Sequence, residues 1–102
     1  MNLSVKERLI LLSILPQEGN FITLKVVRKL REALSFSEEE IKKYKFVQSG
    51  SQVTWDNTIE QGKEIEIGEK ATDIITETLK KLDEQKKLKD EYFSVCEKFI
   101  NL

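Results

Sequence analysis

Apolar residues recur at helical spacing near the start of the chain, and this spacing predicts a first helix. Ser4 followed by Glu7 is a capping box, in which each side chain accepts a hydrogen bond from the other residue's backbone N–H. The helix is predicted to run to about Leu15, because Pro16 cannot continue it. Leucine and isoleucine cover most of its circumference, so we expect it to lie near the centre of the fold.

Two further helices are predicted after a polar turn. The second, over residues 23–34, has an apolar stripe on one side and cations over much of the rest of its surface. The third is short, over residues 38–44, and a second capping box formed by Ser37 and Glu40 opens it. The N-terminal part of the chain is therefore predicted to be three consecutive helices.

The apolar pattern then changes from helical to alternating. Residues 46–48 and 52–55 flank a turn around Gly50, which predicts a β-hairpin. Residues 63–67 alternate strictly between charged and apolar side chains, which predicts a further strand. Three helices followed by strands is the element order of a winged-helix domain, so we predict a winged-helix-like core over residues 1–68.

Helical spacing returns in the last third of the chain. A long helix is predicted over residues 69–85 and a final helix from about Asp90, which form either one bent helix or two separate ones. These helices are expected either to cover the winged-helix-like core or to pair between two subunits as a homodimer. Residues 1–102 are expected to form one domain, since domains of this size are common.

The predicted fold class is α+β and mainly helical, with three helices on a small antiparallel sheet and two C-terminal helices over one side. The predicted core consists of Leu9, Leu12, Leu15, Leu24, Val27, Leu30, Leu34, Ile41, Val53, Trp55, Ile65, Ile67, Ile75, Leu79 and Leu82.

Composition argues against an enzyme. The 102 residues include no histidine, which is the side chain most often used for general acid–base catalysis. Cys96 is the only cysteine, so neither an internal disulfide nor a Cys/His zinc site is available. The single glycines form no phosphate-binding loop. We therefore expect no catalytic residues, no cofactor and no metal. The longest apolar run, residues 9–15, is too short to span a membrane, and a cytoplasmic protein without a membrane partner is expected.

Positive charge gathers on the second and third helices, although the net charge of the whole chain is −1. These cations are the candidate contacts for a partner, with Lys6 and Arg8 extending the patch from the first helix. One interpretation is an electrostatic contact with nucleic acid or with an acidic protein surface. The other is a solvated face that Glu32 partly neutralises. The candidate contact residues are Lys25, Arg28, Lys29, Arg31, Lys42 and Lys43.

Two features weaken the DNA-binding interpretation. Glu38, Glu39 and Glu40 open the third helix, where a winged-helix DNA reader would contact bases, and carboxylates repel phosphates. The hairpin tip, residues 48–52, is uncharged. The sequence therefore favours a non-enzymatic protein-interaction module. The alternative is a DNA-binding winged-helix transcriptional regulator.

The chain also resembles small proteins that bacteriophages and prophages often encode. The resemblance is carried by residues 3–16, residues 21–35, the run from Ser37 to Glu40, the segment over residues 66–71 and the leucine-rich C-terminal helix. It covers nearly the whole chain as a general pattern and transfers no functional residue. It implies an accessory or regulatory protein of a phage.

Overall fold

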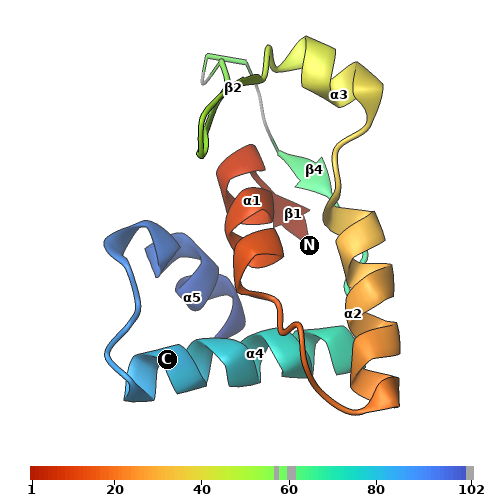
Figure 1. Ribbon diagram of the computed structural model, residues 1–102, viewed down its shortest axis with the longest axis vertical. Helices are drawn as coiled ribbons and strands as arrows, with labels where there is room; N and C mark the ends of the chain where they lie inside the picture. Colours follow the sequence, from red (N-terminus) through yellow and green to blue (C-terminus); the bar gives the residue numbers. More distant parts are fainter. Residues whose placement is uncertain (57, 60–61, 101–102) are drawn as a thin grey trace.

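The computed structural model describes residues 1–56, 58–59 and 62–100 as a mainly helical α+β fold (Figure 1). The helices are α1 (Val5–Ile14), α2 (Phe21–Leu34), α3 (Glu38–Lys43), α4 (Glu69–Glu84) and α5 (Phe93–Phe99), with the 3-10 turn η1 (Asp90–Tyr92) before α5. The strands are β1 (Asn2–Leu3), β2 (Val47–Ser49), β3 (Gln52–Thr54) and β4 (Lys63–Glu64).

Polar caps set the starts of the first three helices. Both predicted capping boxes are confirmed: Ser4 and Glu7 exchange hydrogen bonds before α1, and Ser37 and Glu40 do so before α3. Helix α2 begins two residues earlier than predicted, because the side-chain oxygen of Asn20 accepts a hydrogen bond from the Thr23 backbone N–H at 2.8 Å.

The strands form two separate pairs. The hairpin strands β2 and β3 pair antiparallel with each other, with Gln48 opposite Val53, and Gly50 makes the turn at a φ of 61°. Strand β4 pairs instead with β1, which the sequence pattern did not predict. The strand predicted over residues 63–67 is shorter than expected. Its partner offers only Asn2 and Leu3, and one further bond from the Ile65 N–H to the Met1 carbonyl oxygen extends the pairing.

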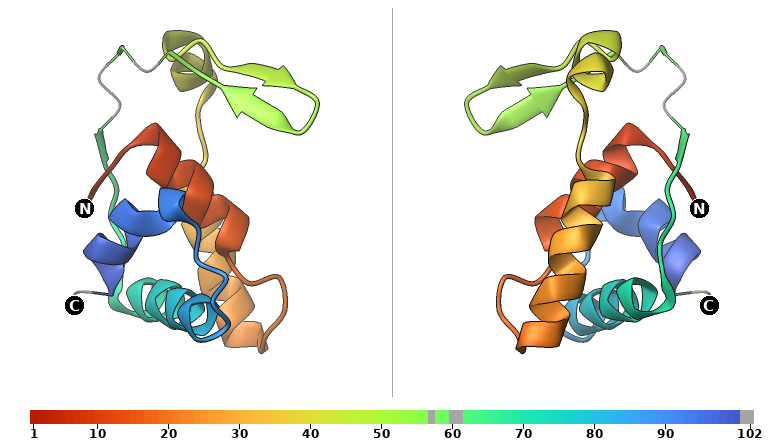
Figure 2. Two further views of the ribbon diagram at one scale, coloured as in Figure 1. Left: turned by 90° about the vertical axis from the view of Figure 1, so that its left-hand side faces the viewer. Right: turned by 90° about the vertical axis from the view of Figure 1, so that its right-hand side faces the viewer.

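The helices other than α3 pack around a shared core. Helix α4 packs against α2, and α5 packs against both α1 and α4. The C-terminal helices are therefore two separate helices that cover the core. Helix α3 and the hairpin stand apart from this body, and the hairpin projects sideways from α3 (Figure 2). We call residues 36–56 the α3–hairpin lobe; within this range only Tyr44 is buried.

Several of the predicted core residues are buried: Leu15, Val27, Leu30, Leu34, Ile65, Ile75 and Leu79. The prediction was wrong for Ile41 and Val53, which are 42% and 37% exposed because the lobe does not fold back onto the helices. The remaining predicted core residues are half-buried: Leu9, Leu12, Leu24, Trp55, Ile67 and Leu82. The core also includes buried residues outside the predicted set, among them Leu3, Val5, Ile10, Leu11, Val95 and Phe99.

Among the residues that the structure describes, no helix is long and apolar enough to cross a membrane.

Candidate functional site

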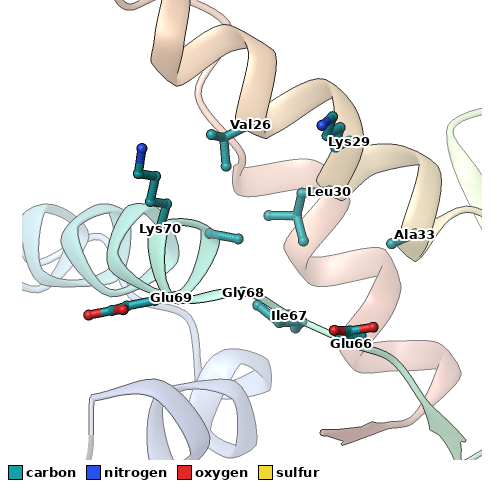
Figure 3. A pocket seen from close by; sticks show the side chains of 10 residues that line it. Val26, Lys29, Leu30, Ala33, Glu66, Ile67, Gly68, Glu69 and Lys70 are labelled. Atoms are coloured by element: carbon teal, nitrogen blue, oxygen red, sulfur yellow. The ribbon is translucent and has the colours of Figure 1, made fainter.

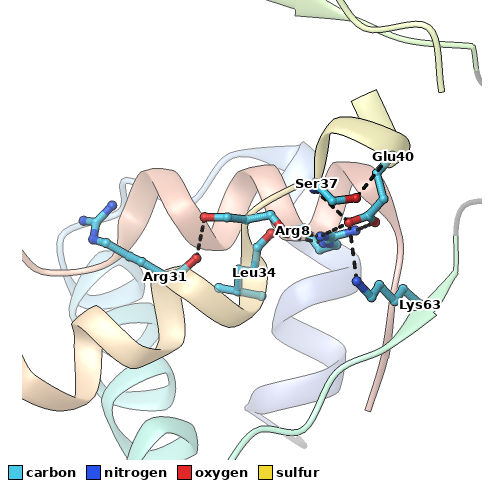
Figure 4. A network of polar contacts seen from close by, with 7 residues as sticks. Arg8, Arg31, Leu34, Ser37, Glu40 and Lys63 are labelled. Carbon is cyan, nitrogen blue, oxygen red and sulfur yellow. Dashed lines mark hydrogen bonds and ion pairs between the residues drawn. The ribbon is translucent and has the colours of Figure 1, made fainter. Parts of the chain in front are cut away.

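Arg8 lies in the protein interior, so the prediction that it extends a basic surface patch was wrong. Its side chain is fully buried, and its guanidinium donates to the carbonyl oxygens of Leu34 and Ser35, at 3.1 and 2.6 Å (Figure 4). A third hydrogen bond runs from Nη1 to Oε2 of Glu40, at 2.6 Å. The fixed fork of the guanidinium can satisfy several acceptors at once, which suits arginine to this position. Arg8 therefore connects α1, the end of α2 and α3.

Glu40 is the second half of this connection. Its carboxylate also lies 3.4 Å from Nζ of Lys63, and it accepts a hydrogen bond from the Ser37 backbone N–H. The hydrogen bond from Arg8 is the main cause that lowers the pKa of Glu40 to about 2, and the Ser37 N–H and the two positive charges act in the same direction. Glu40 is therefore ionised at neutral pH, and it ties the α3–hairpin lobe to the helical body.

Glu7, which precedes Arg8 on α1, has a comparable structural role. It is 5% exposed and forms an ion pair of 2.6 Å with Nζ of Lys98 on α5. Burial raises the pKa of Glu7, but the hydrogen bonds from Lys98 and Ser4 outweigh it and the net pKa is lowered. Lys98 also donates to the carbonyl oxygen of Asn2, at 2.7 Å. This network joins the two ends of the described chain.

An apolar groove lies between the α3–hairpin lobe and α1, with a volume of about 400 Å³. None of its lining residues, all within the described part of the chain, carries a charge. The lining comes from α1, from the segment after α2, from α3, from the residue before the hairpin and from the hairpin itself. The lining residues are Leu9, Leu12, Ser35, Phe36, Ile41, Phe46, Gln48 and Val53.

The hairpin register explains which residues face this groove. Gln48 and Val53 are opposite each other across the hairpin and share the face that lines the groove, whereas Val47, opposite Thr54, lies on the other face. Two aromatic rings, Phe36 and Phe46, are part of the lining and pack against neighbouring side chains. Phe46 contacts Phe36 edge to face with the ring centroids 4.9 Å apart, and it also meets Trp55 edge to face. The guanidinium of Arg8 lies 3.9 Å from the ring centroid of Phe36, so the ion pair with Glu40 also contacts this lining.

A second pocket, of about 360 Å³, lies between α2 and the start of α4 (Figure 3). Apolar side chains line it from both sides, including Val26 on α2 and Ile67 on the segment before α4. Lys29 and Lys70 line it together with Glu66 and Glu69, so the charges around it cancel. This mixture favours no ligand of one charge.

The six cations predicted to contact a partner come from two different elements. On α2, Lys25, Arg28 and Lys29 are exposed, while Arg31 is half-buried and its Nη1 lies 3.4 Å from the Leu12 carbonyl oxygen. On α3, both predicted lysines are exposed. None of the six forms an ion pair with another residue in the described ranges, including Glu32. Helix α3 lies beyond the C-terminal end of α2 (Figure 1). The cations therefore remain available, but they do not converge on one site.

The remaining chemistry of the described residues is limited. Residues 1–56, 58–59 and 62–100 contain no group of three or more acidic, histidine or cysteine side chains arranged to hold a metal. Cys96 is half-buried, and burial, together with the nearby charge of Asp83, raises the pKa of its thiol. The unreactive protonated form is therefore favoured at neutral pH.

Comparison with protein-family models, with curated proteins and with solved structures finds no match to this chain.

Proposed function

We propose that the protein is a non-enzymatic interaction module that binds an apolar segment of a partner protein in the groove between α1 and the α3–hairpin lobe. The observation that carries this proposal is the uncharged lining of the groove, together with the open placement of Ile41 and Val53. Large apolar side chains left exposed around a recess commonly mark an interaction site.

The size and chemistry of the groove indicate what it accepts. Its volume of about 400 Å³ lies within the range of roughly 300–1,000 Å³ that binding pockets occupy. Because the lining contains no charged side chain, an apolar side chain can enter the groove without dehydrating a charged group. Ser35 and Gln48 are the polar groups of the lining and can orient a backbone amide. An amphipathic segment that presents two or three apolar residues fits these features best.

The proposal can be tested by selecting a yeast-displayed random peptide library against the protein. We expect enrichment of peptides with clustered leucine, isoleucine or phenylalanine. Val53→Lys should weaken their binding by about tenfold or more, because a bound peptide would cover position 53 and a charged side chain there would lose its water. Val47→Lys is the matched control, since Val47 lies on the opposite face of the same hairpin and is 58% exposed. Equal losses in both variants, or no loss in either, would overturn the proposal.

A phage accessory role is part of the same proposal, and the resemblance to small phage-encoded proteins supports it. Such a protein would act in the cytoplasm on a complex of the host. A genomic neighbourhood made up of housekeeping genes, without phage or mobile-element genes, would argue against this role.

A homodimer through the C-terminal helices remains a proposal of its own. Phe93 on α5 is 66% exposed and could provide apolar contact between two copies. Sedimentation equilibrium of the wild type and of Phe93→Lys tests this directly. A dimer that the substitution converts to a monomer supports the proposal, and a wild-type monomer contradicts it.

DNA binding is the second candidate function, and the unpaired state of Lys25, Arg28 and Lys29 among the described residues is the observation in its favour. Fluorescence anisotropy of labelled duplex DNA at about 50 mM and about 200 mM salt separates the two functions, because phosphate contacts weaken steeply with salt. An absence of binding at both salt concentrations would eliminate this candidate.

A further inference from the structure

The solvent-facing side of α2 combines large apolar residues with cations. Successive residues of a helix are about 100° apart, so Phe21, Lys25, Arg28 and Glu32 fall on one side, with Ile22 and Lys29 beside them. The buried residues of α2 lie on the other side of the helix. We call Phe21, Ile22, Lys25, Arg28 and Lys29 the outer face of α2.

Phe21 and Ile22 are unusually open to solvent for residues of their type. Phe21 is 80% exposed and Ile22 is 64% exposed, and the two are adjacent in the first turn of α2, whose buried residues are Val27, Leu30 and Leu34. The helix begins at the end of the molecule opposite to the α3–hairpin lobe (Figures 1 and 2). The outer face of α2 is therefore a separate surface from the groove. Neither side chain belongs to the hydrophobic core of the described residues.

We propose that the outer face of α2 binds an acidic protein segment that carries a large apolar side chain. Charge complementarity identifies the partner: Lys25, Arg28 and Lys29 are exposed within two helical turns, and each lacks an ion pair to any residue described in the structure. Carboxylates of the segment would pair with these cations, and its apolar side chain would cover Phe21 and Ile22. Such a site needs no contribution from the groove, so it extends the proposed function to a second surface.

Two observations favour an acidic protein segment over a phosphate-bearing partner. Glu32 lies one helical turn beyond Arg28 on the same side of α2, and it would repel a continuous array of phosphates. Discrete carboxylates on a protein segment can be spaced to avoid it. The exposed side chains of Phe21 and Ile22 would bury little apolar surface against a nucleic-acid backbone. Aromatic and apolar side chains are, in contrast, common anchors between proteins.

The test uses the same yeast-displayed random peptide library, now with charge-reversal variants. We expect a class of enriched peptides that contains aspartate or glutamate next to leucine, phenylalanine or tryptophan. The double variant Lys25→Glu/Arg28→Glu should weaken this class by about tenfold or more, and Phe21→Ser should weaken it as well. The matched control is Lys80→Glu/Lys81→Glu, which makes the same charge change on exposed residues of α4. Neither this control nor Val53→Lys should change the affinity for the acidic peptides.

Other results would overturn the proposal. One such result is that no acidic peptides are enriched. Another is that these peptides bind the Lys25→Glu/Arg28→Glu variant as tightly as the wild type. The third is that the Lys80→Glu/Lys81→Glu control weakens their binding equally. The milder Lys25→Gln/Arg28→Gln variant, checked by circular dichroism, replaces the charge reversal if that variant does not fold. Tighter binding to duplex DNA or to phosphatidylglycerol vesicles than to the acidic peptides would assign the face to phosphate groups instead. Because Val53→Lys affects only groove peptides, failure here is distinguishable from failure of the groove proposal.

Discussion

Arg8 on α1 and Glu40 on α3, 32 residues apart in the chain, form a partly buried ion pair, with Nη1 of the arginine 2.6 Å from Oε2 of the glutamate. The side chain of Arg8 is fully buried, and that of Glu40 is 14% exposed. This contact attaches the α3–hairpin lobe to α1. Because α1 and the lobe both line the apolar groove, this ion pair also joins the two parts of the chain that line it.

Replacement of Glu40 by glutamine should destabilise the protein. The buried guanidinium of Arg8 would lose its counter-charge, and we expect the free energy of unfolding to fall by about 2 kcal/mol, less than for a fully enclosed pair because Glu40 is partly open to water. Urea denaturation, followed by the fluorescence of Trp55, measures the change. Glu39→Gln is the control, since Glu39 is exposed in the same turn of α3 and has no ion pair among the described residues. Identical midpoints for the two variants would contradict the expectation.

Stability should decrease in acid because of the same carboxylate. The folded-state pKa of Glu40 is about 2, below its ordinary value of 4.5, so its contribution is complete above about pH 4.5 and is lost as the pH falls toward about 2. Glu7, whose pKa is also lowered, contributes in the same direction. Urea unfolding of wild type and Glu40→Gln at a series of pH values tests this. Between about pH 2 and pH 4.5 the free energy of unfolding should change less with pH in the variant than in the wild type. If the two proteins lose stability in parallel, Glu40 is not the cause of the loss.

Leu79 and Leu82 on α4 should respond differently to truncation. Leu79 is 0% exposed and Leu82 is half-buried, although the apolar pattern assigned both to the core. Leu79→Ala should therefore reduce the free energy of unfolding by about 2–5 kcal/mol, and Leu82→Ala by clearly less. Thermal unfolding with calorimetry compares them. A larger effect at Leu82 would show that the helix is rotated relative to this structure.

Gly68 offers a stabilising substitution. It occupies the N-cap position of α4 at a φ of −70°, makes no side-chain capping bond, and has open space where a Cβ would lie. Gly68→Ser should add a hydrogen bond to the first turn of α4 and raise the free energy of unfolding by a few tenths of a kcal/mol, to about 1 kcal/mol at most. Gly50→Ala is the contrasting case: Gly50 has a φ of 61°, so the substitution should destabilise the hairpin turn. A melting temperature that does not rise for Gly68→Ser would contradict the first expectation.

Local signals in the sequence were sufficient for most of the helices. The capping residues Ser4 and Ser37 fixed two helix starts, because a cap acts within a single turn. The pairing of β1 with β4 was not predictable in this way. Two residues, Asn2 and Leu3, are too few to show a period, and their partners lie some sixty residues away.

The candidate sites show the same limit. The cations of α2 could be found from the sequence. That Arg8 does not belong to the same patch follows from its contact with Glu40, and no local sequence pattern connects these two residues. The groove was missed because apolar residues at Ile41 and Val53 look like core residues from their spacing alone. Only the absence of a covering element distinguishes an open apolar wall from a closed core. Phe21 and Ile22 were overlooked for a similar reason, since a helix start before residue 23 was not expected.

The contact between the two ends of the described chain has a consequence for biosynthesis. Lys98 bonds to Asn2 and to Glu7, and Val95 and Phe99 complete the core. During translation α1 is made early, yet its partner α5 leaves the ribosome only after nearly every other element. Helix α2 can cover part of the newly made α1, but the side of α1 that packs against α5 stays uncovered until synthesis has passed residue 99.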